Sequence, residues 1–315
     1  MASIRAAGGK ARRGLGKLKR ELVPARPEKG APAADLVADS SVTDRVTYVD
    51  FCARAAADDR TFRSFRREPI YVAMLEHVTK EQGADYLRVI RRDSPAFLGK
   101  QLKEFRANDQ WGSPVTHRYP GIGRISPVTL RYLKVLSDLE LLFGDLTGKR
   151  IVEIGVGYGG QARLVLERWV VQSYTLVDLE PALRLASRYL TSSGRYGSLI
   201  FLPSEQIVEA DYDLCVSNYA FSELRRDIQD SYAPALVASA SHGYLTCNFT
   251  SGVQGIDSWS KDQLSRLHAG AHWIPEEPLT FEGNAILVWG DLAGSGAAPA
   301  YPEAVGPLSH LQAQS

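Results

Sequence analysis

The sequence predicts an α/β protein with a mostly parallel sheet of seven strands, helices on both faces, and a helical cap that precedes the sheet in the chain. Short apolar runs rich in valine, isoleucine and leucine alternate with helix-length segments from residue 151 onward. Four glycines follow the first of these runs, and an aspartate ends the second. Alternation of strand and helix patterns indicates βαβ units, which build a parallel sheet.

The composition is that of an ordinary soluble protein, with 44% hydrophobic and 23% charged residues in a chain of 315. The net charge of +1 says little about partners. No run approaches the ~20 apolar residues that span a bilayer, and the N-terminus lacks the apolar core of a secretion signal, so we predict a cytoplasmic protein without a membrane span. Cys52, Cys215 and Cys247 lie far apart among apolar residues, which predicts buried, reduced thiols.

The two ends of the chain differ from its middle. Residues 1–40 are rich in alanine, glycine, proline and basic residues, and we expect a flexible basic arm there. This arm has no aromatic residue to stack on bases, so we do not predict a nucleic-acid partner. Residues 294–315 are predicted to form a C-terminal tail.

A helical segment is predicted over residues 41–125. Ile70, Met74 and Val78 repeat every four residues, as the buried face of a helix requires. No motif with chemistry of its own occurs in this segment.

The core domain is predicted over residues 126–293. Ser126 followed by Pro127 is typical of a helix start, and this helix should run through Leu142 to a stop near Gly144. After the first strand we expect helices at 161–170 and 181–190, with later strands at 199–202, 214–217, 243–248 and 285–289. We expect a C-terminal hairpin to place the last strand antiparallel to the others, a feature that an ordinary dinucleotide-binding fold lacks.

The glycine-rich turn fits two kinds of nucleotide site. Gly155, Gly157 and Gly160 satisfy the G-x-G-x-x-G of dinucleotide-binding folds. Glu153, together with Gly155, Gly157 and Gly159, equally satisfies the E-x-G-x-G-x-G of enzymes that use S-adenosylmethionine. The glycines alone leave both interpretations open.

Asp178 ends the second strand, where an acid can accept hydrogen bonds from ribose hydroxyls in either kind of site. The surroundings favour S-adenosylmethionine, because only about 130 residues follow, which is too few for a second nucleotide-binding half and a catalytic domain. Glu153 also precedes the first glycine, where a carboxylate can attract the ammonium of the methionine moiety directly or through water. NAD has no such cation.

Four motifs closely resemble the bacterial sugar O-methyltransferase family, which belongs to the class I enzymes that use S-adenosylmethionine. They occupy residues 126–133, 151–161, 174–179 and 217–224, and the resemblance extends from about Val46 to Gly290. It implies a Rossmann-like fold and methylation of a hydroxyl on a sugar or glycosylated metabolite, in natural-product or surface-glycan biosynthesis. By analogy with small-molecule methyltransferases, the helical segment should cover the cofactor and shape the acceptor pocket.

The predicted cofactor contacts lie at the ends of the first, second and fourth strands. They are Glu153, Gly155, Gly157, Tyr158, Gly159, Asp178, Leu179, Ser217 and Asn218. Predicted acceptor contacts are Tyr219, Phe221 and, from the helical segment, Trp111. The polar residues Ser204, Glu205 and Gln206 follow the third strand, where such enzymes usually bind adenine.

A sugar hydroxyl needs a base to take its proton as the new bond forms. Glu223 is the first candidate, because it emerges after the fourth strand at the mouth of the sheet; the alternative is a helix-capping role. His242 and His272 are competing bases that would reach the mouth from loops. No metal is predicted, because the paired acids Asp211 and Asp213 flank the start of the fourth strand, at the wrong end of the sheet.

Two other functions stay open at this stage. One is an NAD-dependent oxidoreductase or epimerase that uses the same glycine turn, and the other is a cofactor-binding module without turnover. The sequence also leaves the oligomeric state open, with a homodimer as one option.

Overall fold

A computed structural model describes residues 46–99, 101–194, 196–249 and 256–292. The basic arm and the C-terminal tail predicted for the two ends lie outside the described residues. Three cysteines fall within the described ranges, and all three are buried and free, as predicted. No helix among the described residues is long and apolar enough to cross a membrane.

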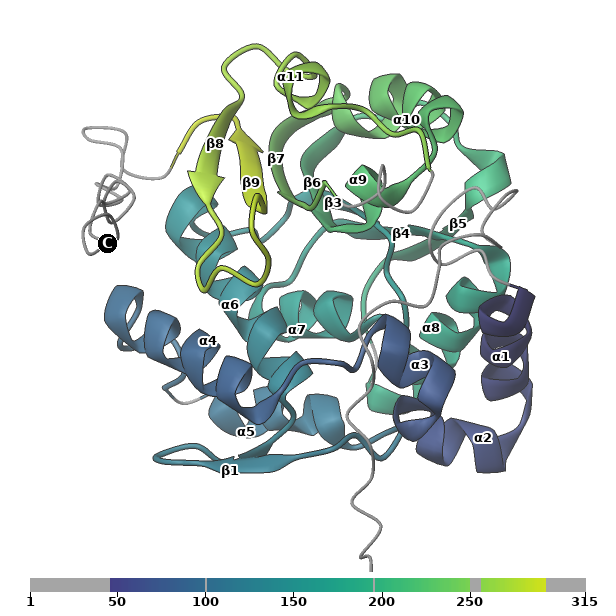
Figure 1. Cartoon of the computed structure of the whole chain (residues 1–315), viewed down its shortest axis with the longest axis vertical. Coiled ribbons are helices and arrows are strands. Elements are labelled where there is room, and N and C mark those ends of the chain that lie inside the picture. The colour runs from purple at the N-terminus through teal and green to yellow at the C-terminus, as the bar shows by residue number, and fades with distance from the viewer. Residues whose placement is uncertain (1–45, 100, 195, 250–255, 293–315) are drawn as a thin grey trace, which may run out of the picture. The chain divides into compact units, whose positions relative to one another are not determined.

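The centre of the fold is a seven-stranded sheet with the order β5-β4-β3-β6-β7-β9-β8 (Figure 1). Its strands are β3 (Arg150–Ile154), β4 (Ser173–Asp178), β5 (Leu199–Pro203), β6 (Tyr212–Asn218), β7 (Ala240–Cys247), β8 (His272–Pro275) and β9 (Ala285–Trp289). β3 to β7 are parallel, whereas β9 runs antiparallel to β7 and β8 on its two sides. The predicted fold class is confirmed, including the antiparallel last strand.

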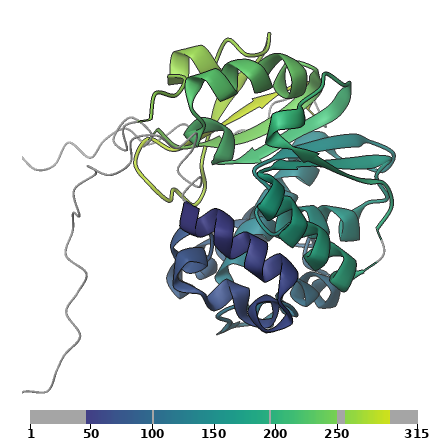
Figure 2. The ribbon, with the colours of Figure 1, turned by 90° about the vertical axis from the view of Figure 1, so that its right-hand side faces the viewer.

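Side chains alternate between two cores, one on each face of the sheet, because successive residues of a strand point to opposite faces. On β3, Ile151 enters one hydrophobic cluster, whereas Val152 and Ile154 enter the other. On β9, Val288 and Leu287 are divided between the clusters in the same way. Figure 2 shows the helices on either side of the strands that complete these cores.

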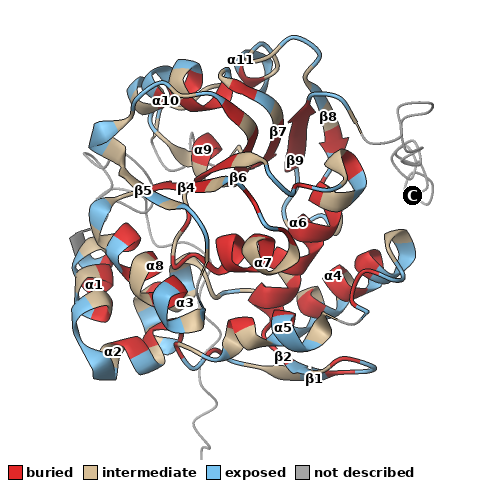
Figure 3. Ribbon diagram, turned by 180° about the vertical axis from the view of Figure 1, so that it is seen from behind, coloured by how far each residue is buried: buried red, intermediate tan, exposed pale blue. Residues whose placement is uncertain are grey.

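The first core lies under α6 (Pro127–Phe143), α7 (Gly160–Arg168) and α8 (Glu180–Ser193), and it continues into the cap. The second lies under α9 (Ala220–Glu223), α10 (Arg226–Tyr232), a π-helical turn at Ala233–Val237, and α11 (Lys261–Leu264). In Figure 3 the buried residues follow the strands and the inward faces of α6 and α7.

α6 begins and ends as its sequence predicts. The Ser126 hydroxyl accepts a hydrogen bond from the Thr129 N–H at 3.3 Å, which caps the helix, and Pro127 occupies the first turn. The helix ends at Gly144, whose φ of 73° lies in the left-handed region that glycine tolerates best.

The cap contains α1 (Val46–Ala57), α2 (Asp59–Ser64), α3 (Pro69–Met74), α4 (Lys80–Asp93) and α5 (Leu102–Arg106). It also contains an unpredicted hairpin, β1 (His117–Tyr119) with β2 (Gly123–Ile125). Strands of three residues are too short for their alternation to be recognised in sequence.

The buried cation of Arg66 connects the cap with the start of α6 through hydrogen bonds and ion pairs. The Arg66 guanidinium is fully buried and bonds the carboxylate of Glu76, with Asp109 and the Ser126 hydroxyl each at 3.2 Å. Asp109 also accepts from the Ser126 N–H at 2.6 Å. Because charges are buried only when they are paired, this network fixes where α6 starts relative to α3.

Candidate active site

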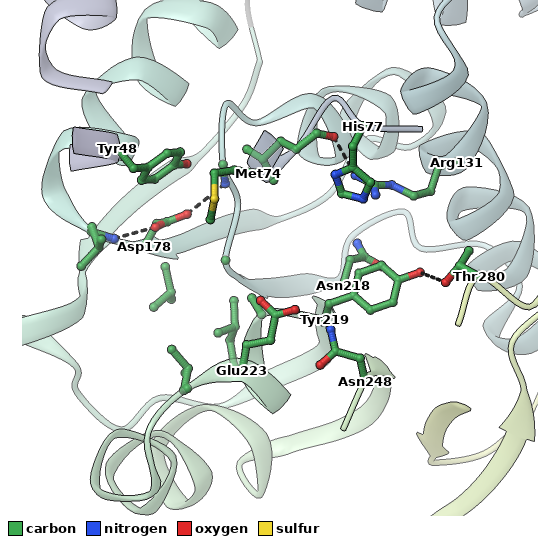
Figure 4. Close-up of a pocket in the computed structure, with 18 of the residues that line it drawn as sticks. Tyr48, Met74, His77, Arg131, Asp178, Asn218, Tyr219, Glu223, Asn248 and Thr280 are labelled. Atoms are coloured by element: carbon green, nitrogen blue, oxygen red, sulfur yellow. Dashed lines mark hydrogen bonds between the residues drawn. The ribbon is translucent and has the colours of Figure 1, made fainter. Parts of the chain in front are cut away.

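A cavity of about 790 Å³ lies at the carboxyl ends of the parallel strands, under the cap. This volume falls within the ~300–1,000 Å³ typical of small-molecule sites. Figure 4 shows how side chains are arranged around it. Tyr48, Met74 and Asp178 lie on one side, and His77, Arg131, Tyr219 and Thr280 lie on the other, with Glu223 and Asn248 between them. Its position is the one at which open α/β sheets bind ligands.

The glycine turn forms one wall of the cavity through Gly155 and Gly157. Their φ angles are +78° and +54°, and a Cβ at Gly155 would overlap the Cβ of Ala220. A Cβ at Gly157 would lie 3.0 Å from Leu75 in the cap. These positions therefore need glycine, because the backbone is both left-handed and closely covered.

Asp178 joins the two strand ends at the cavity wall. Its carboxylate accepts from the Gly157 N–H at 2.9 Å and from the Leu179 N–H at 2.7 Å, and Leu179 lines the cavity beside it. These two bonds hold the carboxylate in place at the cavity wall. The structure thus brings together the glycine turn and the acid, as the sequence predicts.

Glu153 is placed differently from the prediction. Its carboxylate is buried and accepts from the Tyr174 hydroxyl at 2.6 Å, and Glu153 is not among the residues that line the cavity. Burial raises its pKa to about 8, with the Tyr174 hydrogen bond opposing that shift and the charge of Asp178 adding to it. The predicted contact with an ammonium group is corrected: the alternation of β3 points this side chain to the face of the sheet that carries Ile151 and Tyr174.

Tyr158 and Trp111 do not line the cavity either. The Tyr158 ring is fully buried, with Arg66 4.7 Å from its centroid and the Tyr189 ring edge-on at 4.8 Å. The Trp111 ring packs on Phe62 at 5.6 Å. The prediction that these two side chains contact a ligand is therefore corrected. The Trp111 ring packs inside the cap, and the Tyr158 ring packs under the glycine turn. Gly159 starts α7 with a φ of +84° and faces Leu190 rather than the cavity.

Ser217 and Phe221 support the turn after β6 from behind. The Ser217 hydroxyl donates to the Ile154 carbonyl and accepts from the Phe221 N–H, both at 3.0 Å. Phe221 is buried, and its ring lies edge-on to Trp259 at 6.3 Å. Neither lines the cavity, so their predicted direct roles are corrected to positioning of the turn.

Asn218 and Tyr219 do line the cavity. The Asn218 side-chain oxygen accepts from the Thr246 hydroxyl at 3.4 Å. Tyr219 has a φ of +69°, which is uncommon for a non-glycine residue, and its hydroxyl donates to Glu276. Strained backbone of this kind clusters at functional sites.

Glu223 is a carboxylate in the cavity wall, and it accepts a hydrogen bond from the Asn248 amide. Burial raises its pKa, while the Asn248 hydrogen bond and the charge of Arg131 oppose the shift. The bond to Asn248 joins the turn after β6 to the end of β7.

His242 and His272 lie away from the cavity. β7 begins at Ala240, so His242 lies inside the strand, paired with Leu214 near the amino ends, with its Nδ1 2.9 Å from the Asp213 carbonyl. His272 starts β8 and is exposed. The prediction that these imidazoles reach the mouth is wrong, because the cavity is at the opposite ends of the parallel strands.

Several cavity residues were missed by sequence reasoning: Tyr48, Met74, His77, Tyr86, Arg131, Asn248, Thr280 and Asn284. They come from the cap, α6 and the β7 and β8–β9 ends, which no local pattern connects with the glycine turn. The one available signal was the resemblance, which includes residues 71–78 and 126–133. Burial and the charge of Arg131 lower the pKa of His77, which favours a neutral imidazole.

The remaining predictions concern adenine and metal. Ser204 and Glu205 line the cavity, whereas Gln206 does not. Asp211 and Asp213 flank the start of β6 as predicted, and Asp213 accepts from the Arg150 N–H at 2.7 Å. Over the described ranges of the chain, no group of three or more His, Cys, Asp or Glu side chains is arranged to hold a metal ion.

Comparison with known proteins gives distant likenesses. No protein-family model matches the chain. An uncharacterized protein of Haemophilus influenzae is 27% identical over 139 residues, an alignment that covers 40% of this chain and 55% of that protein. The chain thus spans about half the length of the curated relative that it matches.

Solved structures that align with part of the chain include methyltransferases. The N-methyltransferase NodS of Bradyrhizobium japonicum aligns at 16% identity and a TM-score of 0.38, over 50% of this chain and 83% of that chain. An S-adenosylmethionine dependent methyltransferase of Mesorhizobium loti aligns at 20% identity and a TM-score of 0.28, over 35% and 51%. These values are too low to transfer an activity. The strand order and the antiparallel β9 define the fold by themselves, and it is the class I methyltransferase fold that the sequence predicts.

Proposed function

We propose that the protein is an S-adenosylmethionine-dependent O-methyltransferase that acts on a hydroxyl of a sugar or glycosylated metabolite. The observation that supports this most strongly is the Asp178 carboxylate, held by the Gly157 N–H at the wall of a ligand-sized cavity. An acid fixed against a glycine turn is suited to a nucleoside ribose, and the antiparallel β9 argues against an ordinary dinucleotide fold.

The residues of the cavity fit this cofactor. Asp178 would accept from the ribose hydroxyls, the backbone at Gly155 and Gly157 would lie against the ligand, and Ser204 with Glu205 would contact the adenine. The amide of Asn218 would contact the methionine moiety. When bound, S-adenosylmethionine supplies an electrophilic methyl group on a positively charged sulfur.

The protein contributes positioning and proton removal. Holding an acceptor hydroxyl in line with the methyl group supplies much of the acceleration. Glu223 would take the hydroxyl proton, because it is the cavity carboxylate whose pKa burial raises toward the working pH. His77, neutral and also in the cavity, is the second candidate for this step.

The opposite part of the cavity supports a polyhydroxylated acceptor. Asn248, Thr280 and Asn284 line it with amides and a hydroxyl, and the Asn284 Oδ1 atom is buried with no hydrogen-bond partner among the described residues. Phe281, which is 60% exposed, lies at the rim and can cover the apolar face of a sugar ring. Sugars combine these two kinds of surface.

Isothermal titration calorimetry with S-adenosylhomocysteine and with NAD tests the cofactor. We expect binding of the former at micromolar strength and none of the latter. Asp178→Ala should weaken binding by about 2 kcal/mol or more, because ribose hydroxyls lose their acceptor. Binding of NAD instead would favour the oxidoreductase or epimerase, and absence of binding to both would refute the proposal.

A second assay tests the acceptor. Methyl transfer from labelled S-adenosylmethionine should appear with some members of a panel of free, nucleotide-linked and aglycone-linked sugars. Cofactor binding without transfer to any acceptor, including amines and phenols as controls, would instead support a binding module without turnover.

A further inference from the structure

Arg131 places a cation in the cavity wall, and among the described residues it forms no ion pair. It lies in the second turn of α6 and lines the cavity from the side opposite Asp178 (Figure 4). Its Nη2 donates to the Leu75 carbonyl at a long 3.4 Å. Its Nε is buried and has no hydrogen-bond partner among the described residues.

Other buried cations near α6 are paired with carboxylates. Arg66 forms ion pairs with Glu76 and Asp109, and the Lys134 ammonium lies 2.6 Å from Asp138. In the part of the chain that the structure describes, Arg131 has no carboxylate within ion-pair distance. Arg131 itself is half-buried, but its Nε is shielded from water without a partner, and such a group is costly unless it is paired. Its placement therefore needs an explanation outside the described residues.

The carboxylates on which the charge of Arg131 acts are bonded by other groups. Burial raises the pKa of Glu76 and of Glu223, and the charge of Arg131 opposes that rise in both. However, Glu76 is bonded by Arg66, and Glu223 accepts from Asn248. The Tyr132 ring, 5.5 Å from the guanidinium carbon, restrains the side chain without neutralising it.

We propose that Arg131 binds a carboxylate or phosphate group of a ligand in this cavity. A guanidinium offers donors in a planar fork that matches such anions with two parallel hydrogen bonds. Within the proposed function, on which this inference rests, the anion has two sources: the methionine carboxylate of the cofactor, or an acidic group on the acceptor.

Calorimetry with Arg131→Gln distinguishes the sources. S-Adenosylhomocysteine and 5′-methylthioadenosine share the adenosine and the sulfur, but the second lacks the carboxylate. If the cofactor supplies the anion, the variant should bind S-adenosylhomocysteine about tenfold more weakly or worse, with affinity for 5′-methylthioadenosine unchanged. Arg124→Gln, which alters an exposed arginine of the β1–β2 hairpin, should change neither.

If the acceptor supplies the anion, affinity for both nucleosides should stay at the wild-type value. In that case inorganic phosphate or glucuronate should bind wild-type protein saturated with S-adenosylhomocysteine, and this binding should be lost in Arg131→Gln. Glucose serves as the uncharged control for glucuronate.

The proposal is overturned if Arg131→Gln binds every probe as wild type does, or if it weakens both nucleosides equally. A thermal melt checks that the variant is folded, and Arg131→Lys, which keeps the charge without the fork, provides a second variant with an intermediate loss. If wild-type protein binds neither nucleoside, the proposed function fails, and titration of the ligand-free protein with phosphate and glucuronate still tests Arg131.

Discussion

At the scale of single residues, the Glu223 carboxylate derives its chemistry from its surroundings. Burial in the cavity wall raises its pKa, whereas the hydrogen bond from the Asn248 amide and the charge of Arg131 lower it. The sequence placed Glu223 at the mouth of the sheet, but neither the burial nor Asn248 is visible in the chain around it. Its role as base is therefore a prediction that pH-dependent kinetics can test.

We expect Glu223→Gln to lower kcat for methyl transfer by ~10²-fold or more, which is the usual contribution of a general base. In wild type the base must be ionised, so activity should fall as the pH drops through a pKa above the ordinary 4.5 of glutamate. Asn248→Ala should move this acid limb to higher pH, because it removes a hydrogen bond that favours the ionised form. Full activity of Glu223→Gln at all pH values would show that Glu223 is not the base, and His77 would then be the candidate to test.

The buried Glu153 makes a prediction about stability rather than catalysis. Its pKa is raised from 4.5 to about 8, so the folded protein keeps a proton there that the unfolded chain releases. Stability should therefore decline as the pH rises from about 4.5 to about 8. Glu153→Gln, which is neutral throughout, should gain about 2 kcal/mol or more relative to wild type between pH 5 and pH 8.

Urea unfolding of both proteins at the two pH values measures this difference. Glu282→Gln, at an exposed position, is the control and should show no such change. A Glu153→Gln variant whose stability relative to wild type is the same at pH 5 and pH 8 would contradict the protonated, buried carboxyl.

At the scale of elements, the glycine turn between β3 and α7 was the most predictable part of the site. Its conformation depends on local requirements, namely left-handed backbone and close covering, that only glycine meets. The helix start at Ser126 and Pro127 was predictable for the same reason, since a cap acts on the first turn alone. The hairpin β1–β2 was not, because its short strands depend on the packing of the cap.

Gly155 in the turn and Gly148, which precedes β3, provide a matched pair of substitutions. Gly155 and Gly148 have φ angles of +78° and +75°, but a Cβ at Gly155 would overlap Ala220, whereas one at Gly148 would meet nothing within 4 Å. Gly148→Ala should therefore cost only the backbone strain, about 1 kcal/mol. Gly155→Ala should cost clearly more and abolish binding of S-adenosylhomocysteine. Chemical denaturation and calorimetry measure both, and equal costs would contradict the crowding at Gly155.

At the scale of the whole molecule, cap and sheet share a continuous core over the described residues. Tyr48, Phe51 and Tyr71 of the cap belong to the same hydrophobic cluster as Ile151 and Tyr174 of the sheet. The cap also contributes Tyr48, Met74 and His77 to the cavity. Cap and sheet therefore form the site together, which the sequence predicted only by analogy.

We expect this shared core to make unfolding cooperative. Far-ultraviolet circular dichroism, which reports helix and sheet, and tryptophan fluorescence should give coincident urea transitions. Fluorescence is informative in both parts, because Trp111 lies in the cap and Trp289 in β9. Two separate transitions would show that the cap unfolds independently, and the site would then lose one wall first.

The sequence by itself determined the order of β3 to β7 and of α6 to α8, the glycine turn, the position of Asp178 and the start of α6. Each of these follows from a pattern within a few residues, because strand alternation, turn conformation and helix capping are local properties. The antiparallel last strand was also expected, from the motifs that resemble class I methyltransferases.

Tertiary structure decided which side chains meet in the cavity. It brought Arg131, His77 and Asn248 into the cavity that the glycine turn also lines, and it placed Glu153 and His242 outside that cavity. The physical reason is that a parallel sheet gathers the ends of distant segments on one edge, while burial on that edge sets which groups are charged. Neither the meeting of these ends nor the depth of their burial is encoded in any short stretch of chain.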